Sequence, residues 1–352
     1  MQTTREVMAA RIAPSILLRN SDKMKNCDSV ITLAHETSVR LPLVGRFTVT
    51  GATWEISTNC QEILAIMRDV FQPNDREAFP ADLHLYFYVD AGLPDGKPLR
   101  PHFRALEHFY YGTYGPGDSM LVDQRDRRVV GKLSLATARD VGYWKRVILP
   151  YLVGIVSACV GITPVHCACV VKDDLGLLIH GQSGAGKSTL ALSLSLNGFS
   201  YLADDCTYIS GSGSGLQCWG SSAPLKLLPE AVTYFPALAS MVPGQSLNGE
   251  VAFEVEPTET FGVKRSPSCN PGWLIFIERT HEPNAAFRAI GRAESALRLA
   301  SDLELLPPCI AGQREHQLAI IESLVQRGGW VLRHGLRPEP LALAIAQFCS
   351  RN

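Results

Sequence analysis

Eight consecutive residues near the middle of the chain have the types and spacing needed to bind a polyphosphate. They follow the pattern G-x-x-x-x-G-K-[ST] and comprise Gly181, Gln182, Ser183, Gly184, Ala185, Gly186, Lys187 and Ser188. The glycines let the backbone curl so that the first N–H groups of a following helix converge on phosphate oxygens. Lys187 would reach the outer phosphates and Ser188 would ligate Mg²⁺. We predict that these residues, with Thr189, bind the nucleotide.

The flanking sequence supplies the two elements that such a loop requires. An apolar, strand-like segment at 175–180 precedes it, and a helix-forming stretch at 189–196 follows it and ends at Asn197-Gly198. Because strand, loop and helix come in the required order, the pattern indicates a phosphate loop rather than a chance Gly/Ser turn.

An acid pair and a histidine lie at fixed distances from this loop. Asp204 and Asp205 are 17 and 18 residues beyond Lys187, at the end of the next strand-like segment, 199–203. His166 precedes Lys187 by 21 residues, and the segment between reads as two strands joined by a polar turn at 172–174. Such a hairpin would return His166 to the loop. Paired acids at this position suggest one metal ligand and one acid with a further function.

These residues could carry out phosphoryl transfer. A serine hydroxyl is a poor nucleophile near neutral pH, so a carboxylate must orient it and take its proton. Ser188 and an acid could hold the Mg²⁺ that bridges the outer phosphates, while Lys187 offsets the charge of the transferred group. His166 could hydrogen-bond Asp204 or the phosphoryl oxygens and so tune the base. An ordinary strand-end histidine and a structural turn acid are the alternatives for these two positions.

The three elements together resemble the catalytic core of HPr kinase/phosphorylase and its HPr-kinase-related relatives. The resemblance is carried by Pro164-Val165-His166, by the loop 181–188 and by the run from Leu202 to Ile209. It implies an α/β fold with a phosphoenolpyruvate-carboxykinase-like P-loop nucleotide domain, a mixed sheet with helices. It also implies that Asp204 is the catalytic base, with His166 and Lys187 as further catalytic residues. Ser188 and Asp205 would be the metal ligands.

The resemblance further implies a class of substrate. The glycine/isoleucine-rich signature of true HPr kinase/phosphorylases is not found in the chain. The related kinases found beside peptide-modifying genes, including those that phosphorylate a serine of lasso-peptide precursors, are the better comparison. The expected activity is therefore an ATP- and Mg²⁺-dependent kinase acting on a Ser or Thr hydroxyl of a peptide or small protein. A small-molecule kinase and a non-catalytic nucleotide-binding regulatory module stay open, as do GTP or pyrophosphate as donor and the oligomeric state.

Composition sets limits on the class of protein. The chain has 352 residues, of which 46% are hydrophobic and 19% charged, which is typical of a globular protein long enough for two domains. Its 33 basic and 34 acidic residues leave no overall basic field to gather nucleic acid or anionic lipid. The ten cysteines include no zinc-type C-x-x-C spacing, and no secretory signal is recognised. Reduced thiols and a cytoplasmic location are therefore expected.

One apolar run competes with that interpretation. Residues 147–165 form 19 positions without a charge, long enough to span a bilayer. The run contains prolines and glycines and leads directly into His166. We therefore expect no membrane insertion but a buried helix that begins near Thr137 and covers the nucleotide core.

The remaining sequence predicts two domains. Residues 1–150 are expected to form a β-rich accessory or substrate-binding domain, and residues 151–352 the catalytic domain. Strand-like segments occur at 83–89, 109–111, 119–122 and 129–133, with one helix near 60–70. The aromatic residues of these strands could line a peptide-binding surface, although a core position is favoured.

Further elements are expected after the acid pair. The pattern predicts a hairpin of strands at 206–209 and 216–219, a buried strand at 273–278, and helices near 293–301, 313–327 and 339–349. The segment 224–230 resembles one that follows the acids in HPr-kinase-related proteins, so Lys226 could face phosphate. The Gly/Pro-rich interval 243–271, which carries Lys264 and Arg265, could close over substrate or form a surface loop.

Overall fold

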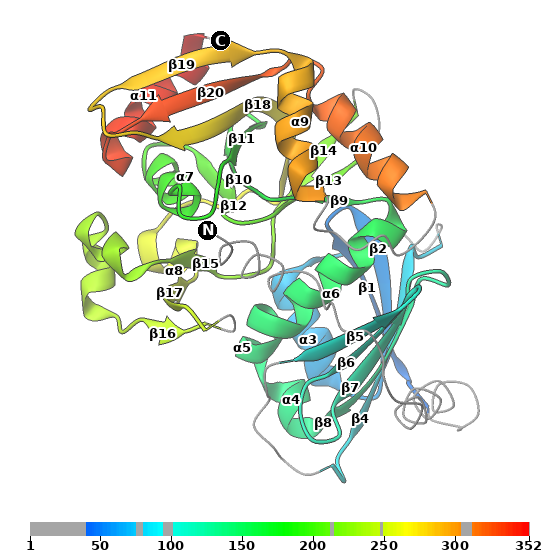
Figure 1. The fold of residues 1–352 in the computed structure, drawn as a ribbon. Helices are drawn as coiled ribbons and strands as arrows, with labels where there is room; N and C mark the ends of the chain where they lie inside the picture. The colour runs from blue at the N-terminus through cyan, green and yellow to red at the C-terminus, as the bar shows by residue number, and fades with distance from the viewer. Residues whose placement is uncertain are drawn as a thin grey trace. The chain divides into compact units, whose positions relative to one another are not determined.

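The computed structural model describes residues 40–74, 80–93, 101–211, 215–246, 249–303 and 312–351. The chain divides into two compact units. The first runs to Gly161 and includes the described residues 312–314, and the second begins at Ile162. Each unit combines helices with a mixed sheet, as Figure 1 shows.

The first unit is built on an eight-stranded sheet in the order β3-β1-β2-β4-β8-β7-β6-β5. The pairs β2–β4 and β4–β8 are parallel, and the others are antiparallel. The strands are β1 (Leu43–Val49), β2 (Ala52–Thr58), β3 (Gln72–Pro73), β4 (Leu83–Asp90), β5 (His102–Leu106), β6 (Phe109–Thr113), β7 (Ser119–Asp123) and β8 (Arg128–Ser134). Its helical segments are α3 (Gln61–Val70), α4 (Leu135–Arg139), α5 (Val141–Tyr143), η2 (Trp144–Ile148), α6 (Leu149–Val156) and η3 (Ser157–Val160).

All four strand-like segments predicted in this region lie in strands, and the helix predicted near 60–70 is α3. Strand β4 buries every second residue, as alternating side chains on a half-buried sheet must. The aromatic residues split accordingly. Phe87 and Tyr110 are buried, whereas Tyr88, Phe109 and Tyr111 are half-buried. The favoured core position is therefore confirmed for two of the five aromatic side chains.

The apolar run packs on the sheet of the first unit. Among the described residues, the helical stretch Val141–Val160 is long and apolar enough to cross a membrane, and 56% of its most apolar window is buried within the structure. The Trp144 ring meets Phe87 edge-on at 5.5 Å, and Tyr151 lies 5.0 Å from Phe103 between ring centroids. The expected helix exists, but its aromatic partners belong to β4 and β5 and not to the nucleotide core.

The observed boundary between the two units also differs from the predicted one. The expected boundary was residue 150, whereas the observed division follows Gly161. Gly161 has a φ of 74°, the left-handed conformation that ends helices readily because glycine has no Cβ. The chain leaves the first unit there and enters β9.

The second unit contains a nine-stranded sheet whose main order is β12-β10-β11-β18-β14-β13-β9, with β20 also on β18 and β19 on β20. The pairs β11–β18 and β18–β20 are parallel, and the others are antiparallel. The strands are β9 (Thr163–Val165), β10 (Cys167–Lys172), β11 (Leu175–His180), β12 (Ser200–Ala203), β13 (Thr207–Ser210), β14 (Gln217–Trp219), β18 (Ser268–Arg279), β19 (Ala285–Ile290) and β20 (Gly329–His334). The helices are α7 (Lys187–Leu196), α9 (Arg292–Leu303), α10 (Gln313–Leu324) and α11 (Pro338–Arg351).

A small three-stranded sheet completes this unit, in the order β15-β17-β16. Its strands are β15 (Leu225–Leu227), β16 (Gly244–Gln245) and β17 (Val251–Val255), with α8 (Pro257–Phe261), η4 (Pro229–Thr233) and η5 (Pro236–Ser240) beside them in the chain. The interval 243–271 is therefore not a long loop as expected. It holds two strands, a helix and the start of β18.

The segment after α8 is held to the sheet by backbone hydrogen bonds. The Tyr201 N–H donates to Lys264 O at 2.7 Å, and the Ser266 N–H donates to Tyr201 O at 2.9 Å. Lys264 and Arg265 thus continue the edge of the sheet beyond β12. The expectation that this segment could close over substrate is not supported by these contacts.

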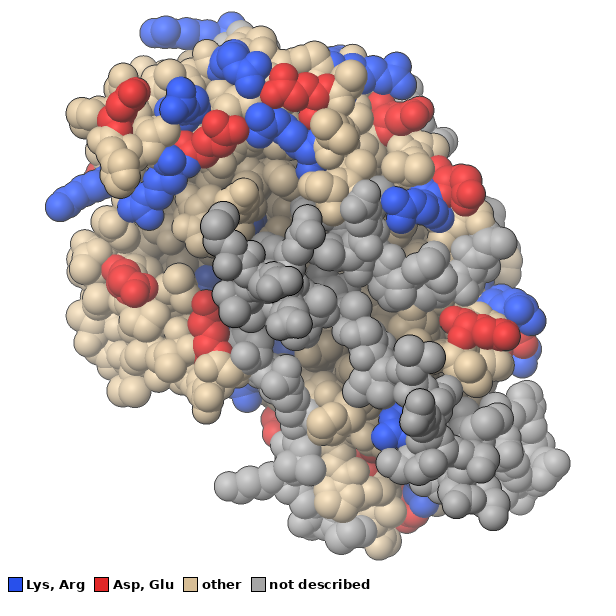
Figure 2. Space-filling view, in the orientation of Figure 1, with Lys and Arg blue, Asp and Glu red and all other residues tan. Residues whose placement is uncertain are grey.

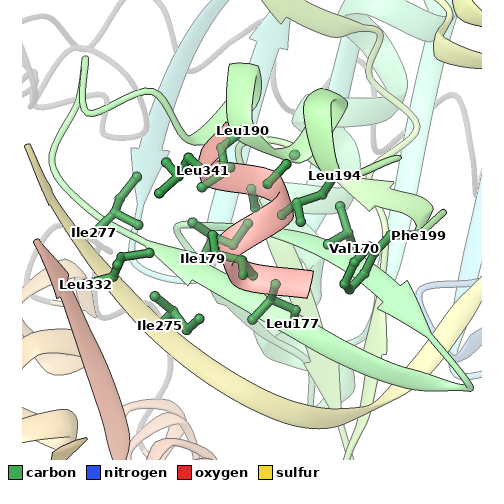
Figure 3. Packing of buried hydrophobic residues seen from close by; sticks show 14 of the residues in the cluster. Val170, Leu177, Ile179, Leu190, Leu194, Phe199, Ile275, Ile277, Leu332 and Leu341 are labelled. Carbon is green, nitrogen blue, oxygen red and sulfur yellow. The ribbon is translucent and has the colours of Figure 1, made fainter. Parts of the chain in front are cut away.

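Helix α7 is packed on two sides. On one side its Leu190 and Leu194 meet Leu177 and Ile179 of β11, in a cluster that also contains α11 (Figure 3). On the other side Leu192 joins a second buried cluster formed by β12, β15, β17 and their connections. Residues 190–195 of the helix are all buried as a result.

Charged side chains are mixed on the surface. On the face in Figure 2, Lys and Arg lie interspersed with Asp and Glu wherever the structure is described. This face shows no region of one sign, in agreement with the near-equal numbers of acidic and basic residues.

The position of Trp144 gives a direct test of how the helical stretch Val141–Val160 packs. The side chain is fully buried, and its indole N–H donates to Thr137 O at 3.0 Å. We expect Trp144→Ala to lower the free energy of unfolding by about 3–5 kcal/mol in urea titrations, through the cavity and the lost aromatic contact. Val141→Ala, at an exposed position of the same helical stretch, should change the free energy of unfolding by less than about 0.5 kcal/mol. Equal, small effects would place Trp144 outside the core.

Candidate active site

A tight hairpin brings His166 to the phosphate loop. Strands β10 and β11 pair antiparallel from Lys172↔Leu175 to Cys167↔His180. The two turn residues, Asp173 and Asp174, have φ values of 51° and 61°, the pair of positive φ angles that a two-residue hairpin turn requires. His166 therefore lies opposite the start of the loop, as predicted.

The loop has the conformation that its glycines permit. Gly184 and Gly186 have φ values of 81° and 94°, and a Cβ built at either would meet nothing within 4 Å. Gly186 caps α7, whose first hydrogen bond runs from the Leu190 N–H to Gly186 O at 2.9 Å. At Gly181 a Cβ would lie 2.7 Å from Ile277 Cγ1, so glycine allows the loop to pack closely on β18. The helix N-terminus beside open space is the arrangement that suits a phosphate.

Lys187 links the loop to His166. The lysine is 7% exposed, and its Nζ donates to Gly181 O at 2.7 Å and to Gln182 O at 3.4 Å. Nζ also lies 3.2 Å from His166 Nε2. Because an ammonium group can only donate, Nε2 accepts and the imidazole proton is on Nδ1.

The other imidazole nitrogen faces the acid pair. His166 Nδ1 lies 3.4 Å from Asp205 Oδ1. We expected His166 to hydrogen-bond Asp204 or phosphoryl oxygens, whereas the carboxylate at its Nδ1 is that of Asp205. The two acids are successive residues at the end of β12, so they point in different directions, and only the second turns toward the histidine.

Asp204 lies in a buried, hydrogen-bonded environment. It is 5% exposed, and its Oδ1 accepts from the Tyr201 hydroxyl at 2.9 Å while Oδ2 accepts from the Lys226 N–H at 3.2 Å. Burial, helped by the negative charge of Asp205, raises the pKa of Asp204 to about 6. The donors from Lys226 and Tyr201 oppose this rise in pKa. Asp204 thus changes charge closer to neutral pH than an ordinary aspartate does.

Asp205 and Ser188 have the donor types that magnesium prefers. The Asp205 side chain is 71% exposed, and Ser188 lies in the first turn of α7, half-buried. The described residues contain no cluster of three or more His, Cys, Asp or Glu side chains able to hold a metal. Mg²⁺ commonly takes one or two protein oxygens and completes its shell with phosphate and water. An exposed carboxylate and a hydroxyl beside a phosphate loop fit that pattern.

The expectation that Lys226 could face phosphate stays a prediction. Lys226 Nζ lies 2.7 Å from Glu250 Oε2, and its backbone N–H binds Asp204. The contact between this residue and the site is therefore made by the main chain.

Tyr201 was missed by the sequence interpretation, which took it as one apolar residue of a strand. Its hydroxyl reaches Asp204 because β12 ends at Ala203 and the chain turns there. A tyrosine three residues before an acid gives no signal for such a contact, because within a continuing strand residues three apart point to opposite faces.

No protein-family model and no curated protein matches this chain. Among solved structures, the Hpr(Ser) kinase/phosphatase from Coxiella burnetii is similar at 14% sequence identity and a TM-score of 0.31. The match covers 54% of this chain and 97% of that chain. The family expected from the motifs stays a prediction.

The raised pKa of Asp204 predicts a pH-dependent stability. The folded protein holds this proton more tightly than the unfolded chain, so the contribution of Asp204 to stability is fully present below about pH 4 and is lost as pH rises through about 6. A pKa about two above the ordinary value corresponds to roughly 3 kcal/mol. In urea titrations with EDTA, wild type should lose about that much stability relative to Asp204→Asn between pH 4 and pH 7. Parallel stability curves for the two proteins would contradict the assignment.

The backbone of the loop gives a second prediction. At Gly186 an alanine would meet no atom but would be forced to a φ of 94°, at a cost of about 1–2 kcal/mol. We expect Gly186→Ala to weaken binding of a fluorescent ATP analogue by about tenfold or more. Gly291→Ala is the matched control, since its Cβ also meets nothing and its φ lies outside the left-handed range. Unchanged binding in Gly186→Ala would show that the left-handed turn is not needed for the nucleotide.

Proposed function

We propose that this protein is an ATP-dependent, Mg²⁺-requiring kinase that transfers phosphate to a Ser or Thr hydroxyl of a peptide or small protein. One observation carries the proposal. The phosphate-loop lysine, His166 and Asp205 form a continuous line of contacts, and Asp204, the neighbouring acid, has a pKa raised to about 6. A base whose pKa lies near the working pH is suited to take a proton from a hydroxyl group.

The phosphate-binding steps follow from the loop. The first N–H groups of α7 face the open side of the loop and would bind the phosphate oxygens. Lys187 would exchange its contacts with Gly181 O and Gln182 O for the outer phosphates, because an ammonium group binds an anion more strongly than a neutral carbonyl. His166, which accepts from Lys187 and faces Asp205, would hold both side chains in place.

The acceptor step follows from Asp204. Its two oxygens each accept one protein donor, and each has a second lone pair. An acceptor hydroxyl bound at one of these lone pairs would be oriented toward the γ-phosphorus. Its proton would pass to Asp204 as the new O–P bond forms, while the bond from the γ-phosphorus to the bridging oxygen breaks and ADP leaves. Mg²⁺, held by Ser188 and Asp205, would supply charge neutralisation across the outer phosphates.

The experiment is an intact-mass measurement. Purified protein, ATP and Mg²⁺ would be incubated with a degenerate Ser/Thr peptide library and with the peptides encoded beside this gene. We expect one added phosphate on a serine or threonine. Bound ATP without any change in peptide mass would contradict a peptide kinase and favour a small-molecule acceptor or a regulatory nucleotide module.

Two variants test the assigned roles. Asp204→Asn should abolish transfer and keep ATP binding, because it removes the proton acceptor and leaves the phosphate loop unchanged. Lys187→Ala should weaken both, because it removes the cation that meets the phosphates. Transfer rates and ATP dissociation constants measured on the same preparations separate the two effects. Full activity in Asp204→Asn would remove the base assignment.

A further inference from the structure

The Tyr201 hydroxyl is directed at the base from a rigidly held ring. The hydroxyl donates to Asp204 Oδ1 at 2.9 Å, and the side chain is 1% exposed. The ring belongs to the buried cluster that contains Leu192 of α7 and Leu225 and Leu227 of β15. Close packing on these sides restricts the rotamers open to the tyrosine.

The backbone of Tyr201 and a further face of its ring are also held in place. The Tyr201 N–H donates to Lys264 O and its carbonyl accepts from the Ser266 N–H, so the segment 264–266 holds the Tyr201 main chain on one side, while pairing with β10 holds it on the other. The Arg265 guanidinium lies 5.4 Å from the ring centroid, and Arg265 itself binds both oxygens of Glu256 at 2.9 and 2.8 Å. A cation held over an aromatic face stabilises that ring position.

Without fixed hydrogen-bond donors, the Asp204 carboxylate would be free to rotate. The terminal torsion of an aspartate is broad, so one donor alone leaves the carboxylate a range of orientations. Here the Tyr201 hydroxyl holds Oδ1 and the Lys226 N–H holds Oδ2. Two donors from different elements, one on each oxygen, fix the direction of the remaining lone pairs.

From this geometry we propose that Tyr201 is a positioning residue, which keeps the Asp204 carboxylate in the orientation that accepts the proton of the acceptor hydroxyl. The inference rests on the proposed kinase function. Phenylalanine would fill the same volume in the cluster and would avoid burying a hydroxyl. What the hydroxyl adds to the ring is its bond to Asp204.

The test uses Tyr201→Phe in the full-length chain. Transfer of the γ-phosphate from MgATP would be measured with a degenerate serine peptide library and with water as acceptors. We expect kcat to fall about tenfold or more, because a loosened base spends little time within reach of the hydroxyl. The KM for ATP should stay within about twofold, because the phosphate loop is untouched. A residue with a structural role alone would not separate these two constants.

Tyr208→Phe is the matched control. Tyr208 is a buried tyrosine on β13, and its hydroxyl bonds to Cys206 and not to Asp204. This variant should keep kcat within about twofold of wild type. Equal losses in the two variants would assign the effect to any missing buried hydroxyl and would overturn the proposal, as would full kcat in Tyr201→Phe.

A double-mutant cycle separates this inference from the function on which it rests. If wild type transfers phosphate neither to peptide nor to water, the proposed kinase function fails. The unfolding midpoints of Tyr201→Phe, Asp204→Ala and the double variant then still test the contact. We expect removal of the hydroxyl to lower the midpoint in wild type and to lower it less when Asp204 is alanine. Additive shifts would overturn the positioning role.

Discussion

The burial of helix α7 on two sides is the constraint on which the candidate site depends. One side packs on β11 and α11, and the other packs on β12 and the small sheet. A helix held in this way can neither rotate nor slide without opening a cavity in one core or the other. Its first turn is therefore fixed at the end of β11, and Lys187 is fixed beside His166. The second core also brings β15 against β12, which is how the Lys226 N–H reaches Asp204.

The two acids show how one turn of the chain creates two environments. Asp204 points into the protein, where loss of solvent raises its pKa, while the side chain of Asp205 is largely exposed. Burying a carboxylate is unfavourable unless donors reach it. Tyr201 and Lys226 supply those donors, and they oppose the rise without cancelling it. The result is one acid suited to proton transfer and one suited to a hydrated cation.

In the first unit, the sequence pattern predicted the apolar helix but not the sheet on which it packs. The apolar run at 147–165 was expected to cover the nucleotide core because it leads directly into His166. Tyr151 of this run packs instead on Phe103 of the first unit, and Trp144, just before the run in the same helical stretch, packs on Phe87. Hydrophobic burial is non-directional, so an apolar helix gives little information about which of two sheets it will cover.

The interval 243–271 was misjudged for a related reason. Its glycines and prolines suggested a loop, but Phe253, Val255 and Val263 are buried against α7 and β12.

The sequence by itself determined the conformation of the glycine loop at 181–188, the strand and helix that flank it, the hairpin that returns His166, and the acid pair at a strand end. These features depend on contacts between residues near one another in the chain and on glycine conformations, which are encoded locally. Only the tertiary structure decided which acid faces His166, that Tyr201 and Lys226 hold Asp204, and that the apolar helix belongs to the first unit. The contacts of Lys226 and of the apolar helix join elements far apart in the sequence, and that of Tyr201 depends on how the chain turns after β12. Such contacts depend on how side chains from several elements pack together in one core. No local sequence pattern specifies that packing.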